Sequence, residues 1–111
     1  MNRDLQYKQD ILEAIEKIRH TVKNKSYDEF MGDADALDAC VRRLEIIGEA
    51  VKRLSVDYKS GVPQVPWKEI AGFRDKAIHD YASLNAAIVW ETIKKDLPAL
   101  RQALTQKNCE T

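Results

Sequence analysis

Apolar residues recur at helical spacing in several long stretches of this chain, and no stretch alternates between apolar and polar residues as a half-buried strand does. The first stretch predicts an amphipathic helix over residues 3–24, with charged residues filling the positions between the apolar ones. Ser26 and Glu29 then match a capping box, so a short helix ended by Gly32 is expected. The apolar positions of the first helix are Leu5, Ile11, Leu12, Ile15, Ile18 and Val22.

A second apolar stripe follows and is wider than the first. Asp33 suits the N-cap position of this helix, which we expect to run to about Val56. A stripe this wide predicts a helix that contacts neighbours on two sides, either inside a bundle or along an oligomer seam. Its apolar positions are Leu37, Cys40, Val41, Leu44, Ile47, Val51 and Leu54, widened by Ala36, Ala39, Ile46 and Ala50.

Residues 58–65 are expected to form a loop, because Gly61 and Pro63 interrupt any regular pattern there. Pro66 suits the first position of a third long helix, where its missing N–H costs nothing. The apolar spacing carries this helix to about Tyr81.

A last helix is expected after Ser83 or Asn85, and Pro98 should kink or restart it. Four long helices with short links predict an all-α fold, an antiparallel bundle of four to five helices that forms one domain over residues 1–111. The apolar positions of the last helix are Ala86, Val89, Trp90, Ile93 and Leu97, continued by Leu100, Ala103 and Leu104.

Composition narrows the class of protein. The chain has 111 residues, 32% of them charged, with only 4 Gly and 3 Pro, which is typical of one soluble helical domain. The formal net charge is zero, so bulk charge gives nucleic-acid binding no support. No apolar run approaches the ~20 residues of a membrane span, and the polar start has no secretory pattern. Two cysteines, Cys40 and Cys109, form no framework, so we expect a cytoplasmic protein.

The residue types best suited to chemistry gather in one short run, Arg74-Asp75-Lys76-Ala77-Ile78-His79-Asp80-Tyr81. Asp75 and His79 are four apart and can touch on a helix, which would favour the protonated imidazole. Arg74 and His79 are five apart, about 140° around an ideal helix. They therefore do not converge on a straight helix. Either the helix distorts or ends here, or two copies of the motif face each other across a dimer.

These groups match the needs of RNA cleavage by the 2′-hydroxyl. His79 can act as general base or acid, and Arg74 can hold the phosphate with two donors. No metal or cofactor is required. Tyr81 could orient the phosphate or a base, or be a modification target. The alternative is structural: Arg74 pairs with a nearby carboxylate, His79 suits a helix C-terminus, and the short motif arises by chance.

Two further features lie on the second long helix. Gly48 costs about 1 kcal/mol against alanine in a helix interior, so close approach of another element is expected there. Glu49 beside it is a candidate polar support for the motif, with a solvated carboxylate as the alternative. The pairs Arg42-Arg43 and Lys52-Arg53 could follow a phosphate backbone, although such pairs are more often solvated.

The order of these elements resembles the HepT-like toxins of the HEPN superfamily, prokaryotic helical ribonucleases paired with a minimal nucleotidyltransferase antitoxin. The resemblance covers about residues 5–104 and is carried by four runs. They are Leu44-Glu45-Ile46-Ile47-Gly48-Glu49-Ala50, the segment from Val65-Pro66-Trp67 to Gly72-Phe73-Arg74, the Arg74-x4-His79-x-Tyr81 motif, and Ile88 to Ile93 followed by Asp96-Leu97-Pro98-Ala99-Leu100.

The resemblance implies an all-α homodimer with the ribonuclease cleft at the dimer interface. It implies that Arg74 and His79 carry metal-independent endoribonuclease activity on an RNA substrate. It also implies that the antitoxin transfers AMP from ATP to Tyr81 and so neutralises the toxin, as in a type VII-like toxin–antitoxin system. The chain departs from similar members at Asp75, where asparagine is frequent. This carboxylate adds negative charge where an RNA phosphate should lie.

Two other interpretations remain open. In the first, the chain is a non-catalytic HEPN-type partner of a nucleotidyltransferase and supplies a binding or regulatory surface. Asp75 and the neutral net charge favour this interpretation modestly. In the second, it is a helical dimerisation protein in which the motif is structural.

Overall fold

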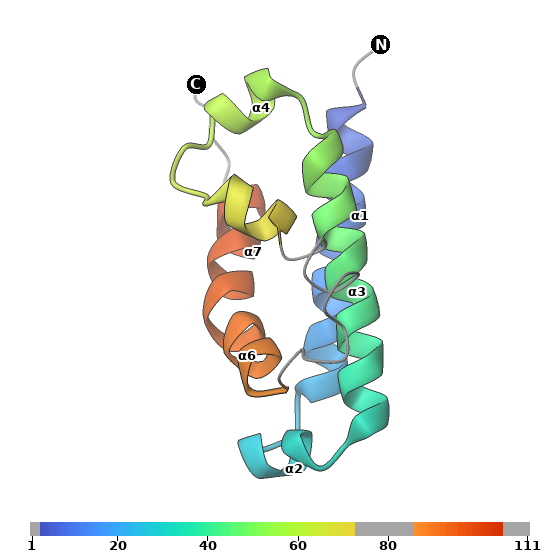
Figure 1. Cartoon of the computed structure of the whole chain (residues 1–111). Coiled ribbons are helices and arrows are strands. Elements are labelled where there is room, and N and C mark those ends of the chain that lie inside the picture. The colour runs from blue at the N-terminus through green and yellow to red at the C-terminus, as the bar shows by residue number, and fades with distance from the viewer. Residues whose placement is uncertain (1–2, 73–85, 106–111) are drawn as a thin grey trace.

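The computed structural model describes residues 3–72 and 86–105, and this part of the chain is helical with no strand (Figure 1). The all-α prediction is therefore confirmed. Residues 67–72 are also helical. The other helices are α1 (Asp4–Val22), α2 (Tyr27–Met31), α3 (Ala34–Arg53), α4 (Val56–Ser60), α6 (Ala86–Glu91), the π-helical η2 (Thr92–Asp96) and α7 (Leu97–Thr105).

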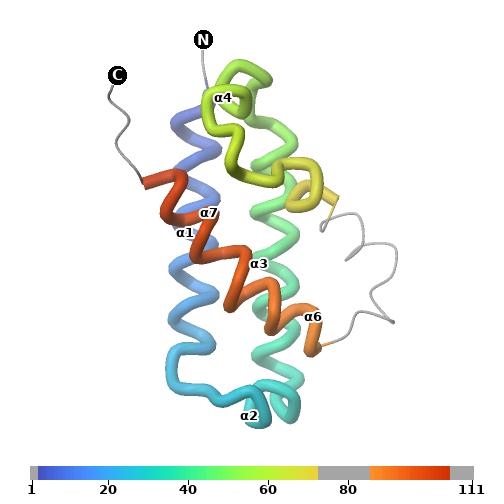
Figure 2. The backbone as a smooth tube through the Cα atoms, turned by 90° about the vertical axis from the view of Figure 1, so that its left-hand side faces the viewer, coloured from blue at the N-terminus to red at the C-terminus, as the bar shows by residue number. Residues whose placement is uncertain are grey.

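A long antiparallel hairpin of α1 and α3 forms the main body of the fold, with α2 at its closed end (Figure 1). The last helix lies obliquely across this hairpin, so that α7 packs on α1 while α6 packs on α3 and α2 (Figure 2). The helix α3 thus has neighbours on two sides within one chain, as its wide apolar stripe predicts for a bundle interior.

The local signals around α2 are confirmed. Ser26 Oγ accepts a hydrogen bond from Glu29 N at 3.1 Å, and Glu29 Oε1 accepts one from Ser26 N at 2.8 Å, which completes the capping box. Asp33 caps α3 by accepting from Ala36 N at 3.0 Å, and its other oxygen lies 2.9 Å from Lys25 Nζ. These two caps set where the hairpin turns.

The expected end of α3 near Val56 and the loop over residues 58–65 are both partly wrong. The helix ends at Arg53, and Ser55 begins α4 by accepting a hydrogen bond from Tyr58 N at 3.0 Å. The reason lies far away in the chain, because Asp4 accepts from Ser55 N at 2.8 Å and from Ser55 Oγ at 2.6 Å. These bonds join the first turn of α1 to the start of α4.

The same contact corrects the apolar face expected for the first helix. Leu5 was expected on the buried stripe, yet it is 71% exposed, whereas Asp4 is only 8% exposed. At the beginning of α1 the Asp4 carboxylate, not the Leu5 side chain, points inward, because it binds Ser55. The stripe holds from Ile11 onward.

The interruption expected near Pro98 takes the form of a π turn. Residues 86–105 form one continuous helical run, and within it Leu97 N donates to Thr92 O, five residues back. Pro98 has no N–H, so the carbonyl four residues before it would lack its helical partner. The wider turn lies directly before this proline, as π bulges do where the regular ladder fails.

The core lies between α1, α3 and the last helix. Cys40 is fully buried and unpaired, as expected, and burial raises the pKa of its thiol to about 11. Where α2 meets α6, the ring of Trp90 lies 5.1 Å from Phe30 and 6.2 Å from Tyr27, centroid to centroid. None of the described helices has the length and apolarity to cross a membrane. The largest fully buried side chains are Phe30, Ile11, Ile15, Ile18, Ile47, Leu100, Leu104, Val51 and Val89.

Candidate functional site

The motif predicted to be catalytic lies outside the described residues. Arg74, Asp75, His79 and Tyr81 all fall within residues 73–85, so their roles, and the sharing of the site across a dimer, remain predictions. The structure describes what leads into the motif: residues 67–72 are helical, and the last of them lies two positions before Arg74 in the sequence.

This lead-in segment is anchored by Trp67. The indole N–H donates to the carbonyl of Lys59 at 3.1 Å and to that of Val62 at 3.0 Å. The ring also contacts Tyr58 edge to face, with centroids 6.3 Å apart. Pro66 directly precedes the first helical residue, one position earlier than expected, and its carbonyl accepts from Ile70 N at 3.2 Å. The helical segment that precedes the motif is therefore fixed to α4 and the turn after it.

Glu49 is engaged on its own helix. Its Oε2 accepts from both Nε and Nη2 of Arg53, each at 2.9 Å, and 38% of its side chain is exposed. The pair lines a hollow of about 510 Å³ between α1 and α3, together with Tyr7 and Arg42. Gly48 beside it is buried in α3. A supporting role for Glu49 at the motif stays a prediction.

The basic pair Lys52-Arg53 is divided between two surfaces. Arg53 binds Glu49 on the α1 side, whereas Lys52 lines a separate recess of about 420 Å³. That recess also receives Lys59 from α4 and Lys68 from residues 67–72. The described residues that line it include no carboxylate; they are Lys52, Val56, Lys59, Ser60, Trp67, Lys68 and Ala71. We call this recess, defined by Lys52, Lys59 and Lys68, the lysine recess.

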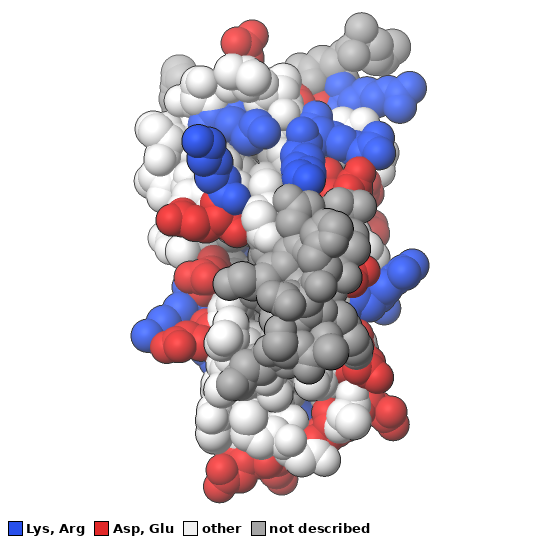
Figure 3. All heavy atoms as spheres, in the orientation of Figure 1, with Lys and Arg blue, Asp and Glu red and all other residues white. Residues whose placement is uncertain are grey.

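Charge is therefore unevenly distributed although the net charge is zero. On the face shown in Figure 3, Lys and Arg side chains gather over α4 and the adjoining end of α3, and Asp and Glu gather at the opposite end, over α2. Sequence reasoning weighed Lys52 as part of a basic pair but missed Lys59 and Lys68. The available signal was Lys68 beside Trp67, a cation next to an aromatic residue at the entry to the motif.

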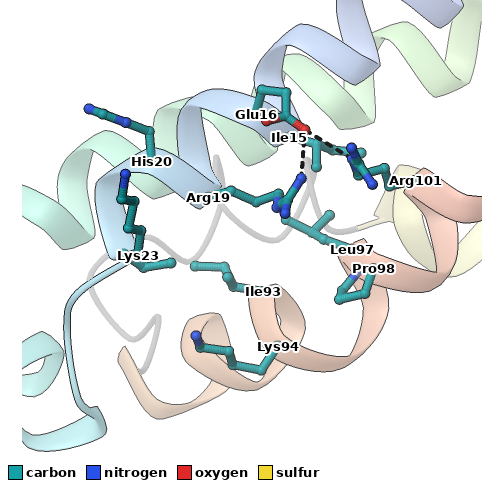
Figure 4. A pocket seen from close by; sticks show the side chains of 11 residues that line it. Ile15, Glu16, Arg19, His20, Lys23, Ile93, Lys94, Leu97, Pro98 and Arg101 are labelled. Atoms are coloured by element: carbon teal, nitrogen blue, oxygen red, sulfur yellow. Dashed lines mark hydrogen bonds and ion pairs between the residues drawn. The ribbon is translucent and has the colours of Figure 1, made fainter.

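A second recess of about 610 Å³ lies between α1 and the last helix (Figure 4). Glu16 bridges its two walls, because Oε2 accepts from Arg19 Nη1 at 2.8 Å and from Arg101 Nε at 2.9 Å. The hydrogen bonds with Arg101 and then Arg19 lower the pKa of Glu16. On the same wall Lys94 Nζ stands 4.6 Å from the ring centre of Trp90. Arg101 thus joins α7 to α1 through Glu16, whereas Arg19 and Lys94 contact partners on their own helical runs.

Comparison with known proteins identifies the family. The model of the family described as "Ribonuclease HepT-like" matches residues 11–106 of this chain. The chain belongs to the HepT-like family. This match spans the hairpin, the lead-in segment, the motif and the last helix, and so covers nearly the whole fold.

Curated relatives agree with this HepT-like assignment. A protein of Caldanaerobacter subterraneus subsp. tengcongensis, named as a "putative RNase", is 45% identical over 100 residues, which cover 90% of this chain and 89% of the relative. The "probable ribonuclease HepT" of Thermococcus cleftensis is 41% identical over 95 residues, covering 86% of each chain. A Methanocaldococcus jannaschii protein also named as an RNase is 43% identical over 93 residues, covering 84% and 77%. No solved structure matches the chain significantly.

Proposed function

We propose that this HepT-like protein is an endoribonuclease in which Arg74 and His79 act on RNA without a metal. The observation that carries the proposal is the family match over residues 11–106, which includes the Arg74-x4-His79-x-Tyr81 motif. Relatives that share 41–45% identity over most of their length are named as ribonucleases.

The motif supplies the groups that the reaction needs. A neutral His79 takes the proton of a ribose 2′-hydroxyl, and the freed oxygen attacks the adjacent phosphorus. The bond from phosphorus to the 5′-oxygen breaks, and that oxygen takes a proton from an imidazolium. The products are a 2′,3′-cyclic phosphate and a 5′-hydroxyl. Arg74 stabilises the charge that develops on the phosphorane oxygens.

Two copies of the chain would complete the site. One chain offers a single histidine in the motif, whereas the reaction uses a base and an acid. The five-residue spacing also separates Arg74 from His79 by about 140° on a straight helix. A homodimer in which two motifs face each other meets both requirements, with one His79 neutral and the other protonated.

Tyr81 is proposed as the control point of this toxin. A nucleotidyltransferase antitoxin would join the Tyr81 oxygen to the α-phosphorus of ATP, with release of pyrophosphate and loss of the phenolic proton. The added AMP places a negative phosphate two residues from His79, where it repels and blocks RNA. With the partner enzyme and ATP, the parent should gain AMP in mass, and Tyr81→Phe should not.

The direct test is cleavage of a labelled RNA by the purified protein in the presence of EDTA. Loss of the base or the phosphate donor should slow cleavage by about 10² to 10⁴-fold, so His79→Ala and Arg74→Ala should both be nearly inactive. Lys17→Ala, an exposed change on α1, is the matched control and should cut like the parent. The site assignment fails if both motif variants cut at the parental rate.

A second candidate function is that of a non-catalytic partner of a nucleotidyltransferase. Asp75 favours it, because this carboxylate residue directly follows the proposed phosphate-binding Arg74 in the sequence. Restoring the neutral side chain distinguishes the two: if Asp75 only reduces activity, Asp75→Asn should cut faster than the parent. Absence of cleavage in both proteins, together with stable binding to the nucleotidyltransferase, would favour the second function.

A further inference from the structure

We infer that the recess between α1 and the last helix binds successive phosphates of an RNA strand (Figure 4). This inference rests on the proposed ribonuclease function and adds to it a surface that holds the strand. We call this hollow of about 610 Å³ the Glu16 recess, after the carboxylate that bridges its walls. The charged residues among its described lining are four cations and one carboxylate, a net charge of +3 with His20 neutral; they are Arg19, Lys23, Lys94, Arg101 and Glu16.

At one end of the Glu16 recess two arginines share a single carboxylate oxygen. Glu16 Oε2 accepts from Arg19 Nη1 at 2.8 Å and from Arg101 Nε at 2.9 Å, so one negative charge faces two positive charges. The bridge uses one nitrogen of each guanidinium, and a guanidinium carries five N–H donors. The two Nη groups of Arg101, whose side chain is 44% exposed, form an edge that fits two oxygens of a phosphate. Glu16 therefore orients both guanidiniums and leaves donors for a ligand.

At the other end of the Glu16 recess two lysines come from opposite walls. Figure 4 shows Lys23 on the α1 side and Lys94 on the last helix, both at the end away from Glu16. Lys94 Nζ lies 4.6 Å from the ring centre of Trp90, a contact that positions the ammonium group without using its N–H donors as hydrogen bonds do. Both lysines are exposed, and no carboxylate among the described residues forms an ion pair with either.

The separation of these cations favours a strand over a single phosphate. Lys94 and Arg101 are seven residues apart, about 10 Å along a helix, and so mark the two ends of one wall. One phosphate is too small to contact both ends, whereas successive phosphates of one strand can. Ile15 and Leu97, which also line the recess, belong to the packed core and hold the two walls at a fixed distance.

The charge of the Glu16 recess also sets it apart from the hollow beside α2. The described lining of that hollow contains Lys25 and four carboxylates, so it would repel a phosphate. RNA is the polyanion that the proposed activity requires the protein to hold. Each contact between a cation and a phosphate releases bound counterions, so the Glu16 recess should add affinity without sequence preference.

The test measures binding of a labelled single-stranded RNA by fluorescence anisotropy, in a His79→Ala background so that the RNA stays intact. Lys23→Ala/Lys94→Ala should weaken binding on the order of tenfold at about 0.15 M salt. It should also reduce the slope of log K against log salt by about 1.4, which is ~0.7 for each lost contact to a single strand. Lys23→Arg/Lys94→Arg keeps both charges and should bind like the parent. An unchanged slope in the alanine variant overturns the inference.

The matched control is Lys17→Ala/Lys95→Ala. Like the test pair, it removes one exposed lysine from α1 and one from the last helix, but neither of these is among the residues that line the recess. The control should keep the parental slope, and both double variants should melt like the parent, because surface substitutions of this kind change stability little. A loss of affinity in the control equal to that in Lys23→Ala/Lys94→Ala would mean that net charge alone acts, and the recess would carry no site.

Two competitors identify the ligand of the Glu16 recess. Because 5′-AMP offers one phosphate and reaches only one end, it should displace the labelled RNA only at far higher concentrations than unlabelled RNA does. Equal competition by 5′-AMP and RNA would show a site for a single phosphate, and the strand would be wrong. If Lys23→Ala/Lys94→Ala binds RNA like the parent but no longer binds the nucleotidyltransferase, the recess serves a protein partner and the RNA assignment fails.

Cleavage by the protein with His79 intact separates this inference from the proposed function. If that protein cuts RNA and Lys23→Ala/Lys94→Ala leaves binding unaltered, only the Glu16 recess is overturned. If it binds RNA through these lysines but never cuts it, the ribonuclease proposal is overturned and the RNA-binding recess stands. If it does not bind RNA, both are overturned.

Discussion

Replacing Asp4 with alanine removes the contact that joins the start of α1 to the start of α4. The carboxylate is 8% exposed and accepts from Ser55 N at 2.8 Å and from Ser55 Oγ at 2.6 Å, across 51 residues of chain. Ser55 in turn caps α4, whose next turn holds the anchor of Trp67. The hydrogen bonds between Asp4 and Ser55 therefore help to position the segment that leads into the motif.

The expected loss can be worked from these distances. Hydrogen bonds to a charged group contribute about 1.5–3 kcal/mol each when buried. Ser55 is itself exposed, so water replaces part of what Asp4→Ala removes. We therefore expect the free energy of unfolding to fall by about 2–3 kcal/mol in total. For a domain of this size that corresponds to a fall in Tm of about 8–12 °C.

Thermal and urea unfolding followed by circular dichroism measure this loss. Asp4→Asn keeps the shape and one acceptor, so it should lose only about 1 kcal/mol. Asp35→Ala, an exposed carboxylate in the first turn of α3, is the control and should lose less than about 1 kcal/mol. A double-mutant cycle with Ser55→Ala should give a coupling of about 1 kcal/mol. The reasoning is refuted if Asp4→Ala costs no more than Asp35→Ala, or if the coupling is zero.

Three further predictions concern other parts of the fold. Trp67→Phe keeps an aromatic ring but loses the indole bonds of 3.1 and 3.0 Å, so urea unfolding should show a loss of about 1–2 kcal/mol. Trp90→Ala opens the contact with Phe30 and should cost about 3 kcal/mol, measured in the same way, since the ring is half-buried. The hydrogen bond from Lys25, followed by that from a backbone amide, lowers the pKa of Asp33 from its ordinary 3.8. The stability that this ion pair adds is therefore present above about pH 4, and it is lost as the pH falls through the lowered pKa of Asp33 in the folded state. In Lys25→Ala the unfolding midpoint should therefore change less with pH over that acid range.

Local patterns predicted the caps and most helices well, because the groups involved are near neighbours in the chain. Ser26 meets Glu29 and Asp33 meets Ala36 within three residues, so their bonds require only a helical turn. The helix α4 was missed because the contact at its start joins Asp4 and Ser55, which are far apart in the chain. Leu54 continues the apolar stripe and is buried, which hides the break after Arg53.

For the candidate site, likewise, the sequence identified the residues but not their arrangement in space. Arg74, His79 and Tyr81 were named from residue chemistry, from their spacing and from the resemblance of the surrounding runs, and the family match includes all three. Their geometry lies outside the described residues. Glu49 was a candidate from its position beside Gly48, and the structure shows its carboxylate bound to Arg53.

By itself the sequence determined the helical class, the caps at Ser26 and Asp33, and membership of the HepT-like family, since periodicity, short-range hydrogen bonds and motif order are all written along the chain. The tertiary structure decided that Asp4 turns inward and that three lysines from separate helical segments line one recess. A net charge of zero is a sum over the chain, and only folding determines where its positive and negative terms lie.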